Sequence, residues 1–292
     1  MLRQNRLAPY VLLAPALSLL IVALGYPLLY SFWLSFHEWT IQSFRRAVPF
    51  VGFANYARLL SEPAFWRSLG VTSTFMLGAL TLEFGCGIGL ALLLNQTLRA
   101  RAVMRSIILL PMMATNVVIG LVWRMMMNYD AGVINWALGL LGIGPVPWLS
   151  EPANAVPSLI LVDVWNTTSF VALIVLAGLQ AIPDEPLEAA LMDGATRMQR
   201  FRFITLPLLR PALLVALVWR VIDTFRIFDV VFTLTGGGPA NATEVISLFA
   251  YRAGFQKFDL GYASASSYAM ILIMLVVSSV LFRWISRAEQ LY

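Results

Sequence analysis

Six long apolar blocks, separated by polar connections, constrain the fold of this chain more than any other feature of its sequence. The blocks cover residues 9–36, 69–94, 104–127, 156–180, 207–235 and 263–285. At a rise of about 1.5 Å per residue, a helix of each length crosses a hydrocarbon core about 30 Å thick. Their apolar residues run on without a period of 2 or 3.6, which is typical of segments that face lipid. The pattern predicts an all-α integral membrane protein with six transmembrane helices in a single domain over residues 1–292.

Composition narrows the functions that are open to such a protein. Hydrophobic residues make up 60% of the chain and charged residues 12%, far from the values of soluble domains. The net charge of +5 is spread over the connections, so it indicates membrane topology and lipid contact, not nucleic-acid binding. With one His and one Cys in the sequence, we expect no catalytic residues, no metal site and no enzymatic activity.

The distribution of arginine predicts how the chain is oriented. The connections 95–105 and 181–206 each contain three arginines, whereas 128–155 contains no Lys or Arg. With six spans, the two arginine-rich connections and both termini share one side, which the positive-inside rule makes the cytoplasm. The connection 37–68 is the exception, because its four arginines would then be external. The other segments outweigh it, so a multi-pass protein with both termini in the cytoplasm is expected.

A polar segment at 183–207 interrupts the apolar pattern between the fourth and fifth blocks. Pro183 cannot continue the preceding helix, so the chain turns there. Asp184 is placed to cap a new short helix, and Glu188 in its first turn suits the positive end of the helix dipole. Gly194 permits a left-handed turn at its end. The segment predicts a short, acid-rich helix that is exposed at the cytoplasmic membrane surface and suited to a cleft on another protein.

The same segment carries a family motif. Glu188-Ala189-Ala190 is followed at fixed offsets by Gly194 and then by Ile204, Leu206 and Pro207. This resembles the EAA loop of permease subunits in bacterial ABC importers, which docks into the cytoplasmic ATPase. The resemblance implies a type I importer permease fold, and it implies ATPase coupling through Glu188, Ala189, Ala190, Asp193 and Gly194. The chain has no phosphate loop ending in Gly-Lys-Ser/Thr, so it is expected to bind no cofactor, with ATP and Mg²⁺ on the partner ATPase.

Two further segments refine the resemblance. Residues 223–244, DTFRIFDVVFTLTGGGPANATE, and the phrases YRAGF at 251–255 and GYASA at 261–265 resemble the larger permease subunit of maltose-type importers. The large external domain of the enteric maltose subunit is missing. The resemblance implies import of a mono- or oligosaccharide or polyol across the bacterial inner membrane. It also implies three kinds of partner: a second permease subunit, two ATP-binding subunits and an extracytoplasmic solute-binding protein.

The fourth block is the most polar of the six at its centre, with the run Asp163-Val-Trp165-Asn-Thr167-Thr-Ser169. Hydroxyl groups beside an aromatic face suit a sugar ring. The resemblance to the maltose-type subunit implies that the substrate is bound by Asn116, Asp163, Trp165, Thr167, Arg220 and Thr224. The alternatives are an interfacial or packing role for the tryptophan and interhelical hydrogen bonds for the hydroxyls.

Charged residues inside the apolar blocks leave other functions open. Arg220, Asp223, Arg226 and Asp229 recur every third residue in the fifth block. Neighbours in this series can pair with each other; alternatively, Arg220 can admit an anionic solute such as a glycerol phosphate. Glu83, an isolated carboxylate in the second block, either pairs with a neighbouring helix or couples transport to an ion. In the second case the chain would be a secondary transporter that works without ATP.

Overall fold

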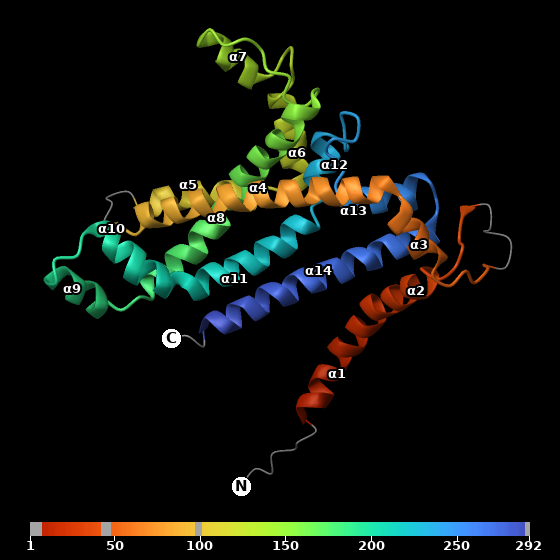
Figure 1. Ribbon diagram of the computed structural model, residues 1–292, viewed down its shortest axis with the longest axis horizontal. Helices are drawn as coiled ribbons and strands as arrows, with labels where there is room; N and C mark the ends of the chain where they lie inside the picture. The colour runs from red at the N-terminus through yellow and green to blue at the C-terminus, as the bar shows by residue number, and fades with distance from the viewer. Residues whose placement is uncertain (1–7, 42–47, 97–100, 290–292) are drawn as a thin grey trace. The chain divides into compact units, whose positions relative to one another are not determined.

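The computed structural model describes residues 8–41, 48–96 and 101–289, and its regular elements are helices (Figure 1). The first half contains α1 (Ala8–Leu20), α2 (Tyr26–Leu34), α3 (Ala54–Ser61), α4 (Pro63–Leu94), α5 (Arg101–Met113), α6 (Asn116–Met126) and α7 (Val133–Leu140). The second half contains α8 (Pro152–Gln180), α9 (Glu185–Met192), α10 (Arg197–Arg200), α11 (Leu206–Phe225), α12 (Asp229–Leu234), α13 (Ile246–Tyr251) and α14 (Leu260–Glu289). The all-α prediction is confirmed. The arginine-bearing stretches 1–7, 42–47 and 97–100, which contributed to the predicted orientation, lie outside the described residues.

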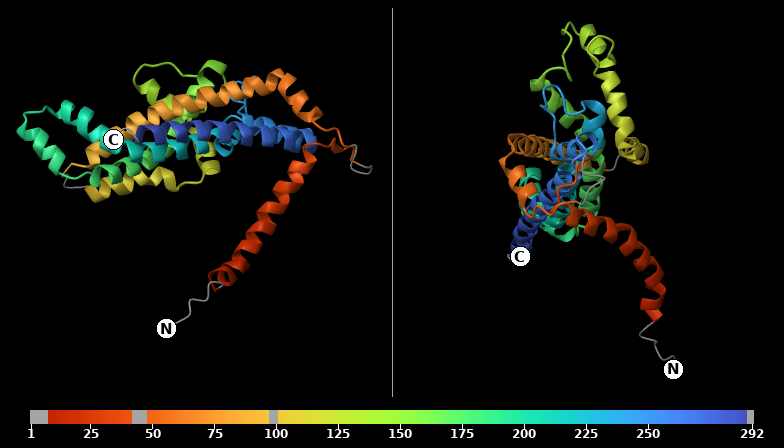
Figure 2. Two further views of the ribbon diagram at one scale, coloured as in Figure 1. Left: turned by 60° about the horizontal axis from the view of Figure 1, so that its bottom comes forward. Right: turned by 90° about the vertical axis from the view of Figure 1, so that its right-hand side faces the viewer.

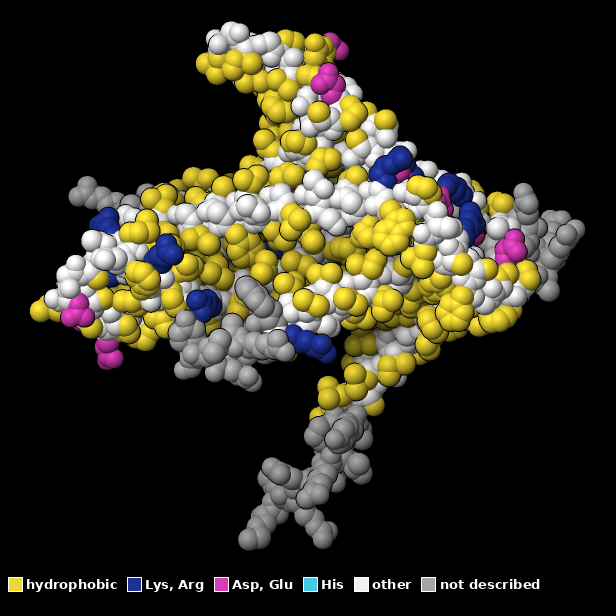
Figure 3. All heavy atoms as spheres, in the orientation of Figure 1, with side chains coloured by type: hydrophobic (Ala, Val, Ile, Leu, Met, Phe, Trp, Pro, Cys, Tyr) yellow, Lys and Arg dark blue, Asp and Glu magenta, His cyan; other side chains and the backbone are white. Residues whose placement is uncertain are grey.

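Five helical runs of the described chain are long and apolar enough to cross a membrane: Leu12–Leu34, Pro63–Leu94, Pro152–Gln180, Arg197–Phe225 and Leu260–Arg283. A sixth span requires α5 and α6 to be counted together. Hydrophobic side chains cover most of the visible flanks of the long helices (Figure 3). Exposed side chains such as Leu77, Leu272 and Val276 are stable on these flanks if the surrounding solvent is lipid.

The expected span 104–127 is not one helix, because α5 and α6 meet at an angle of 95° (Figure 2). Pro111 lies in the last turn of α5 and cannot donate a backbone hydrogen bond. Two residues after that turn, Thr115 has an extended backbone with φ −73° and ψ 141°, and α6 starts anew at Asn116. The apolar run in the sequence therefore conceals a bend.

The expected span 207–235 is also divided. α11 ends at Phe225, and α12 begins only at Asp229. The carbonyl of Ile227 lies in this break between the helices, and it accepts a hydrogen bond from the hydroxyl of Ser247. Asp229 therefore lies on a different helix from Arg220, and the expected ladder of charges does not continue along one helix to Asp229.

The chain separates into two compact units, and the prediction of a single domain remains a prediction. The first unit comprises residues 1–65 and 249–272, and the second comprises 66–248 and 273–292. In the first unit, Arg58 of α3 forms an ion pair of 2.8 Å with Asp259, just before α14. This hydrogen-bonded ion pair raises the pKa of Arg58 above its ordinary value. Asn55 is buried there and donates to the carbonyls of Ser35 and His37.

The second unit contains the candidate site and the polar segment 183–207. Within it, α8 packs against α5 and α11, and α6 packs against α12. Two glycines permit the close approach of long helices: a Cβ on Gly87 would lie 2.7 Å from Val171, and one on Gly178 would lie 2.7 Å from Ala212. An apolar cluster that includes Leu94, Val175 and Leu209 fills the space between α4, α8 and α11. This packing brings the polar centres of the three helices together.

Candidate functional site

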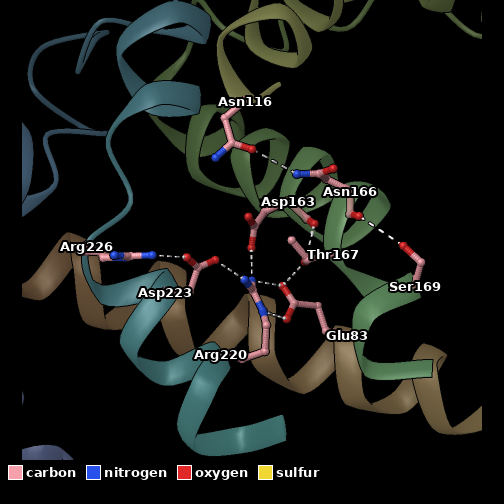
Figure 4. A network of polar contacts seen from close by, with 9 residues as sticks. All are labelled: Glu83, Asn116, Asp163, Asn166, Thr167, Ser169, Arg220, Asp223 and Arg226. Carbon is pink, nitrogen blue, oxygen red and sulfur yellow. Dashed lines mark hydrogen bonds and ion pairs between the residues drawn. The ribbon is translucent and has the colours of Figure 1, made fainter. Parts of the chain in front are cut away.

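The buried guanidinium of Arg220 is the centre of a polar network between α4, α8 and α11 (Figure 4). Its Nε and Nη2 atoms donate to the two carboxylate oxygens of Glu83 at 2.7 and 2.8 Å. Nη2 also donates to Asp163 at 2.8 Å, and Nη1 donates to Asp223 at 2.7 Å. The side chains of Arg220 and Glu83 are 2% and 0% exposed. One arginine on α11 thus holds a carboxylate from each of two other helices.

The buried charged groups of this network are paired with each other and hydrogen-bonded. A guanidinium has five N–H donors, and the contacts above use four of its donor positions. The hydroxyl of Thr167 lies 2.9 Å from a carboxylate oxygen of Glu83 and 2.7 Å from the carbonyl oxygen of Asp163, so two acceptors share its single proton. Burying a charge is costly unless it is paired and hydrogen-bonded, which these contacts accomplish. Arg220 is therefore fixed in position by its neighbours.

The network becomes accessible at its Asp223 end. The side chain of Asp223 is 40% exposed, and its second oxygen accepts a bond of 3.2 Å from Arg226. Arg226 is itself exposed and is the first residue after α11. The pairs Arg220–Asp223 and Asp223–Arg226 confirm the i, i+3 ion pairing expected for this part of the series. The spacing of three residues along the chain was enough to predict these two pairs.

Next to the charges lies a group of neutral polar and aromatic side chains. Nδ2 of Asn166 on α8 donates to Oδ1 of Asn116 at the start of α6, at 3.3 Å (Figure 4). Oδ1 of Asn166 and Oγ1 of Thr224 are buried without a hydrogen-bond partner among the described residues. The indole of Trp165 is 45% exposed and meets Trp123 edge to face, with ring centroids 5.5 Å apart. Polar atoms without a partner and an accessible indole are suited to a polar solute with an apolar face.

The predicted substrate residues are drawn from α6, α8 and α11, and the structure connects several of them. Asp163 contacts Arg220 directly, and Thr167 reaches the same network through Glu83. Asn116 forms a hydrogen bond to Asn166 of α8. Within the described part of the chain, Trp165 and Thr224 form no hydrogen bond to the others, and their roles as ligands stay predictions.

Two members of this site, Asn166 and Trp123, were not predicted as substrate residues, although Asn166 lies within the polar run that the sequence marked on α8. The expected pairing of Glu83 with a neighbouring helix is confirmed by its ion pair with Arg220. Glu83 is the sole carboxylate within α4. A single carboxylate at that depth was the available signal that a basic partner lies opposite. No local pattern marks Trp123, because its contact with Trp165 depends on the bend between α5 and α6.

The polar segment 183–207 forms the short helix that the sequence predicted, α9, with Pro186 in its first turn. Its end is a Schellman motif. The N–H of Ala195 donates to the carbonyl of Ala190 at 2.9 Å, and the N–H of Gly194 donates to Leu191 at 3.1 Å. Gly194 has φ +76°, the left-handed turn that was expected. Glu188, Ala189 and Asp193 are exposed, whereas Ala190 is buried.

The predicted cap by Asp184 is wrong. Asp184 occupies the N-cap position with φ −72° and ψ −28°, and its side chain makes no capping bond. This helical backbone geometry differs from the extended one that a capping side chain requires. The reciprocal capping box occurs instead at α10, between Thr196 and Gln199. α10 then continues through a π-helical turn, Phe201–Thr205, into α11.

Residues 84–290 match the family described as binding-protein-dependent transport system inner membrane component. The chain belongs to this family. It is an inner membrane permease subunit of an ABC importer, a transport subunit and not an enzyme, as expected. Glu83 is the residue just before the matched region.

The relatives cover nearly the whole permease. The trehalose/maltose transport system permease protein MalF of Thermococcus litoralis is 43% identical over 270 residues, 92% of this chain and 90% of that protein. The sulfoquinovosyl glycerol transport system permease protein SmoG of Agrobacterium fabrum is 36% identical, over 96% of this chain and 90% of that protein. A chain in the crystal structure of a bacterial ABC transporter involved in the import of the acidic polysaccharide alginate has a TM-score of 0.83 at 26% identity, over 96% of this chain and 95% of that one. These matches confirm the expected type I importer permease fold.

Proposed function

We propose that this permease forms half of an import path for a carbohydrate, and that the solute contacts the surface shared by α6, α8 and α11. The observation that carries the proposal is that Oδ1 of Asn166 is buried without a hydrogen-bond partner, while the indole of the preceding residue on α8, Trp165, is accessible. A sugar supplies hydroxyl donors for the first group and C–H faces for the second. The trehalose and maltose named for two relatives fit the same chemistry.

The proposed assembly contains a second permease subunit, two ATP-binding subunits that hold ATP and Mg²⁺, and an extracytoplasmic solute-binding protein. A related permease structure, with a TM-score of 0.81, is a complex with an alginate pentasaccharide-bound periplasmic protein, which supports the last partner. Both termini and the α9–α10 segment would face the cytoplasm. There, the exposed residues Glu188 and Asp193 would meet basic residues of the ATPase.

The continuity of the helices supports a mechanism of coupling. Residues Arg197–Phe225 form one uninterrupted helical run, which begins beside α9 and carries Arg220 near its other end. Arg220 in turn holds Glu83 of α4 and Asp163 of α8. A displacement of α9 by the ATPase would therefore move α11 and the helices paired with it as a body, and so open one end of the path while closing the other.

The proposal is tested by transport in proteoliposomes that contain the permease, its partner permease and the ATPase, with the solute-binding protein outside. The panel is trehalose, maltose, sucrose and glycerol, each radiolabelled, with and without ATP. We expect ATP-dependent accumulation of at least one carbohydrate. Accumulation of none of them, or uptake by the permease alone without ATP, would overturn the proposal.

A further inference from the structure

We propose that the start of the helical run Arg197–Phe225 binds the headgroup of an anionic phospholipid. The arginines of this start, Arg197, Arg200 and Arg202, are named here the arginine strip. They lie in the chain between α9, the helix proposed to meet the ATPase, and the membrane-crossing part of α11. The inference goes beyond the proposed import of a carbohydrate, because the binding of lipid is measured without transport.

The length of this helical run places the arginine strip at the membrane surface. The run has 29 residues, and α11 itself, Leu206–Phe225, accounts for 20 of them. Twenty helical residues already cross a hydrocarbon core about 30 Å thick. The residues before α11, 197–205, therefore extend beyond the core by about 13 Å, which is the depth of the headgroup layer.

Charge is divided along the polar segment that contains the strip. Residues 184–193 include four acidic side chains and no basic one, whereas 194–205 include the three arginines and no acidic one. Basic side chains likewise gather over α10 and the start of α11, apart from the acidic ones of α9 (Figure 3). No carboxylate among the described residues forms an ion pair with the strip. Its positive charge is thus available to an anion from outside the chain.

Two arginines of the strip lie close enough together to share one anion. Arg197 and Arg200 are three residues apart on α10, a spacing that puts Cβ atoms about 5–6 Å from each other. Like charges at this spacing destabilise a helix, and an anion between them removes the repulsion. Nε of Arg200 is buried without a hydrogen-bond partner among the described residues. The oxygens of a phosphodiester are suitable acceptors for these N–H groups.

Large apolar side chains are exposed beside the arginines. Met198 is 71% exposed and Phe203 is 69% exposed. The guanidinium carbon of Arg202 lies 6.0 Å from the centre of the Phe203 ring, so basic and apolar groups are neighbours on one surface. Such a surface is typical of segments at the membrane interface, where basic clusters attract anionic headgroups. It matches both parts of a phospholipid, the charged headgroup and the acyl chains, whereas inorganic phosphate matches only the first.

The test measures which lipid lies beside the strip. Cys86 is the only cysteine of the chain, and Leu208 is exposed in the first turn of α11. Cys86→Ser/Leu208→Cys, the reporter protein, therefore carries a single thiol close to the strip for a bimane fluorophore. It is assembled with the partner permease and the ATPase in phosphatidylcholine nanodiscs. These contain brominated phosphatidylglycerol or, in a second set, brominated phosphatidylcholine at the same low mole fraction.

Bromine quenches the bimane of the reporter protein when a brominated lipid lies beside it. We expect brominated phosphatidylglycerol to be enriched at this position at least about fivefold over brominated phosphatidylcholine. One arginine near an anionic lipid surface is worth about that factor in binding. Raising the salt concentration should lower the enrichment, because exposed charges are screened.

Matched variants of the reporter protein separate charge from position. Arg197→Gln/Arg202→Gln removes two exposed charges and should bring the quenching by the two lipids close to equality. Arg197→Lys/Arg202→Lys keeps the charges and should keep most of the enrichment. Arg67→Gln removes an exposed arginine near the start of α4 and should leave the enrichment unchanged.

Equal quenching by the two brominated lipids in the reporter protein would overturn the inference, as would an enrichment that persists in Arg197→Gln/Arg202→Gln. If inorganic phosphate lowers the enrichment more than sodium chloride does at the same ionic strength, the strip binds free phosphate and lipid is not its occupant. Loss of the ATPase from the glutamine variant with the enrichment unchanged would assign the arginines to the ATPase. Failure of carbohydrate uptake with the lipid enrichment intact would contradict the proposed function and leave this inference standing.

Discussion

Glu83 on α4 and Arg220 on α11 lie 137 residues apart in the sequence and form a two-point ion pair, with Nε–Oε2 at 2.7 Å and Nη2–Oε1 at 2.8 Å. Both side chains are almost fully buried. Because Asp163 of α8 shares the same guanidinium, one arginine fastens three membrane helices. The pair is thus a structural joint at the same depth as the proposed solute site.

Removing one buried charge of this network should be more damaging than removing all of them. Glu83→Ala leaves a buried guanidinium with less compensation, and such single losses cost about 3–5 kcal/mol. The triple variant Glu83→Leu/Asp163→Leu/Arg220→Met replaces the buried charges with apolar groups and should recover much of that loss, since Asp223 is 40% exposed and keeps Arg226 as a partner. Thermal unfolding of the purified permease in detergent checks this order. A triple variant less stable than Glu83→Ala would contradict it.

The turn at the end of α9 should depend on its glycine. Gly194 has φ +76°, a conformation that costs other L-residues roughly 1–2 kcal/mol. Gly194→Val should disturb the turn and lower co-purification of the ATPase, whereas Gly194→Asn should retain most of it, since Asn adopts this conformation readily. Equal losses in both variants would show that the absence of a side chain matters, and not the backbone angle.

Two exposed acidic residues of α9 provide a test variant and a matched control for the prediction that this helix docks into the ATPase. Glu185 and Glu188 both lie in its first turn and are exposed. Glu188→Ala should reduce ATPase association and uptake strongly, while Glu185→Ala, outside the family motif, should have little effect. The stability of the permease should be unaffected by either change, because neither side chain packs in the fold. Pull-down of the ATPase by the tagged permease measures the difference.

Local chemistry explains what the sequence could predict. The turn before α9 and the left-handed end at Gly194 follow from the backbone preferences of proline and glycine, which act within a few residues. The capping box of Thr196 and Gln199 fits the pattern of Ser/Thr followed three residues later by Gln, so it was readable as well. The predicted cap at Asp184 failed because a suitable residue type does not fix its own backbone angles.

The buried network and the bend could not be derived in the same way. Whether Arg220 meets a solute or Glu83 depends on which faces of α4 and α11 are turned toward each other, and long apolar helices carry little periodicity to settle this. The direction of α6 likewise depends on its packing against α12, far along the chain. Hydropathy gave the lengths of the spans but not their breaks at 114–115 and 226–228.

The accessible indole of Trp165 should contribute to solute affinity. Its contact with Trp123 holds the ring in place while 45% of the residue remains exposed. Trp165→Ala should weaken binding of the transported sugar by about tenfold, and Trp165→Tyr should restore part of it, because aromatic contacts are worth roughly 0.5–1.5 kcal/mol beyond buried area. Titration of the sugar on the complex of permease and ATPase in nanodiscs measures the affinity of both variants. Trp136→Ala on α7 is the control. Unaltered binding in Trp165→Ala would assign the ring to packing alone.

Asn166 offers a sharper distinction between a ligand group and a structural one. Its Oδ1 is buried without a partner, and its Nδ2 bond to Asn116 is long, at 3.3 Å. A buried polar atom that lacks a partner costs about 1–3 kcal/mol, so replacing it with the apolar side chain of Leu should not lower the melting temperature and can raise it. If the same oxygen accepts a hydroxyl from the solute, Asn166→Leu should weaken sugar binding by about tenfold. If Asn166 is retained for solute binding, Asn166→Leu should therefore leave stability unchanged or raise it, and should weaken the affinity for the sugar. A less stable Asn166→Leu permease with wild-type affinity would show that the amide serves the fold, because loss of a purely structural hydrogen bond lowers stability without changing the affinity of a site that it does not touch.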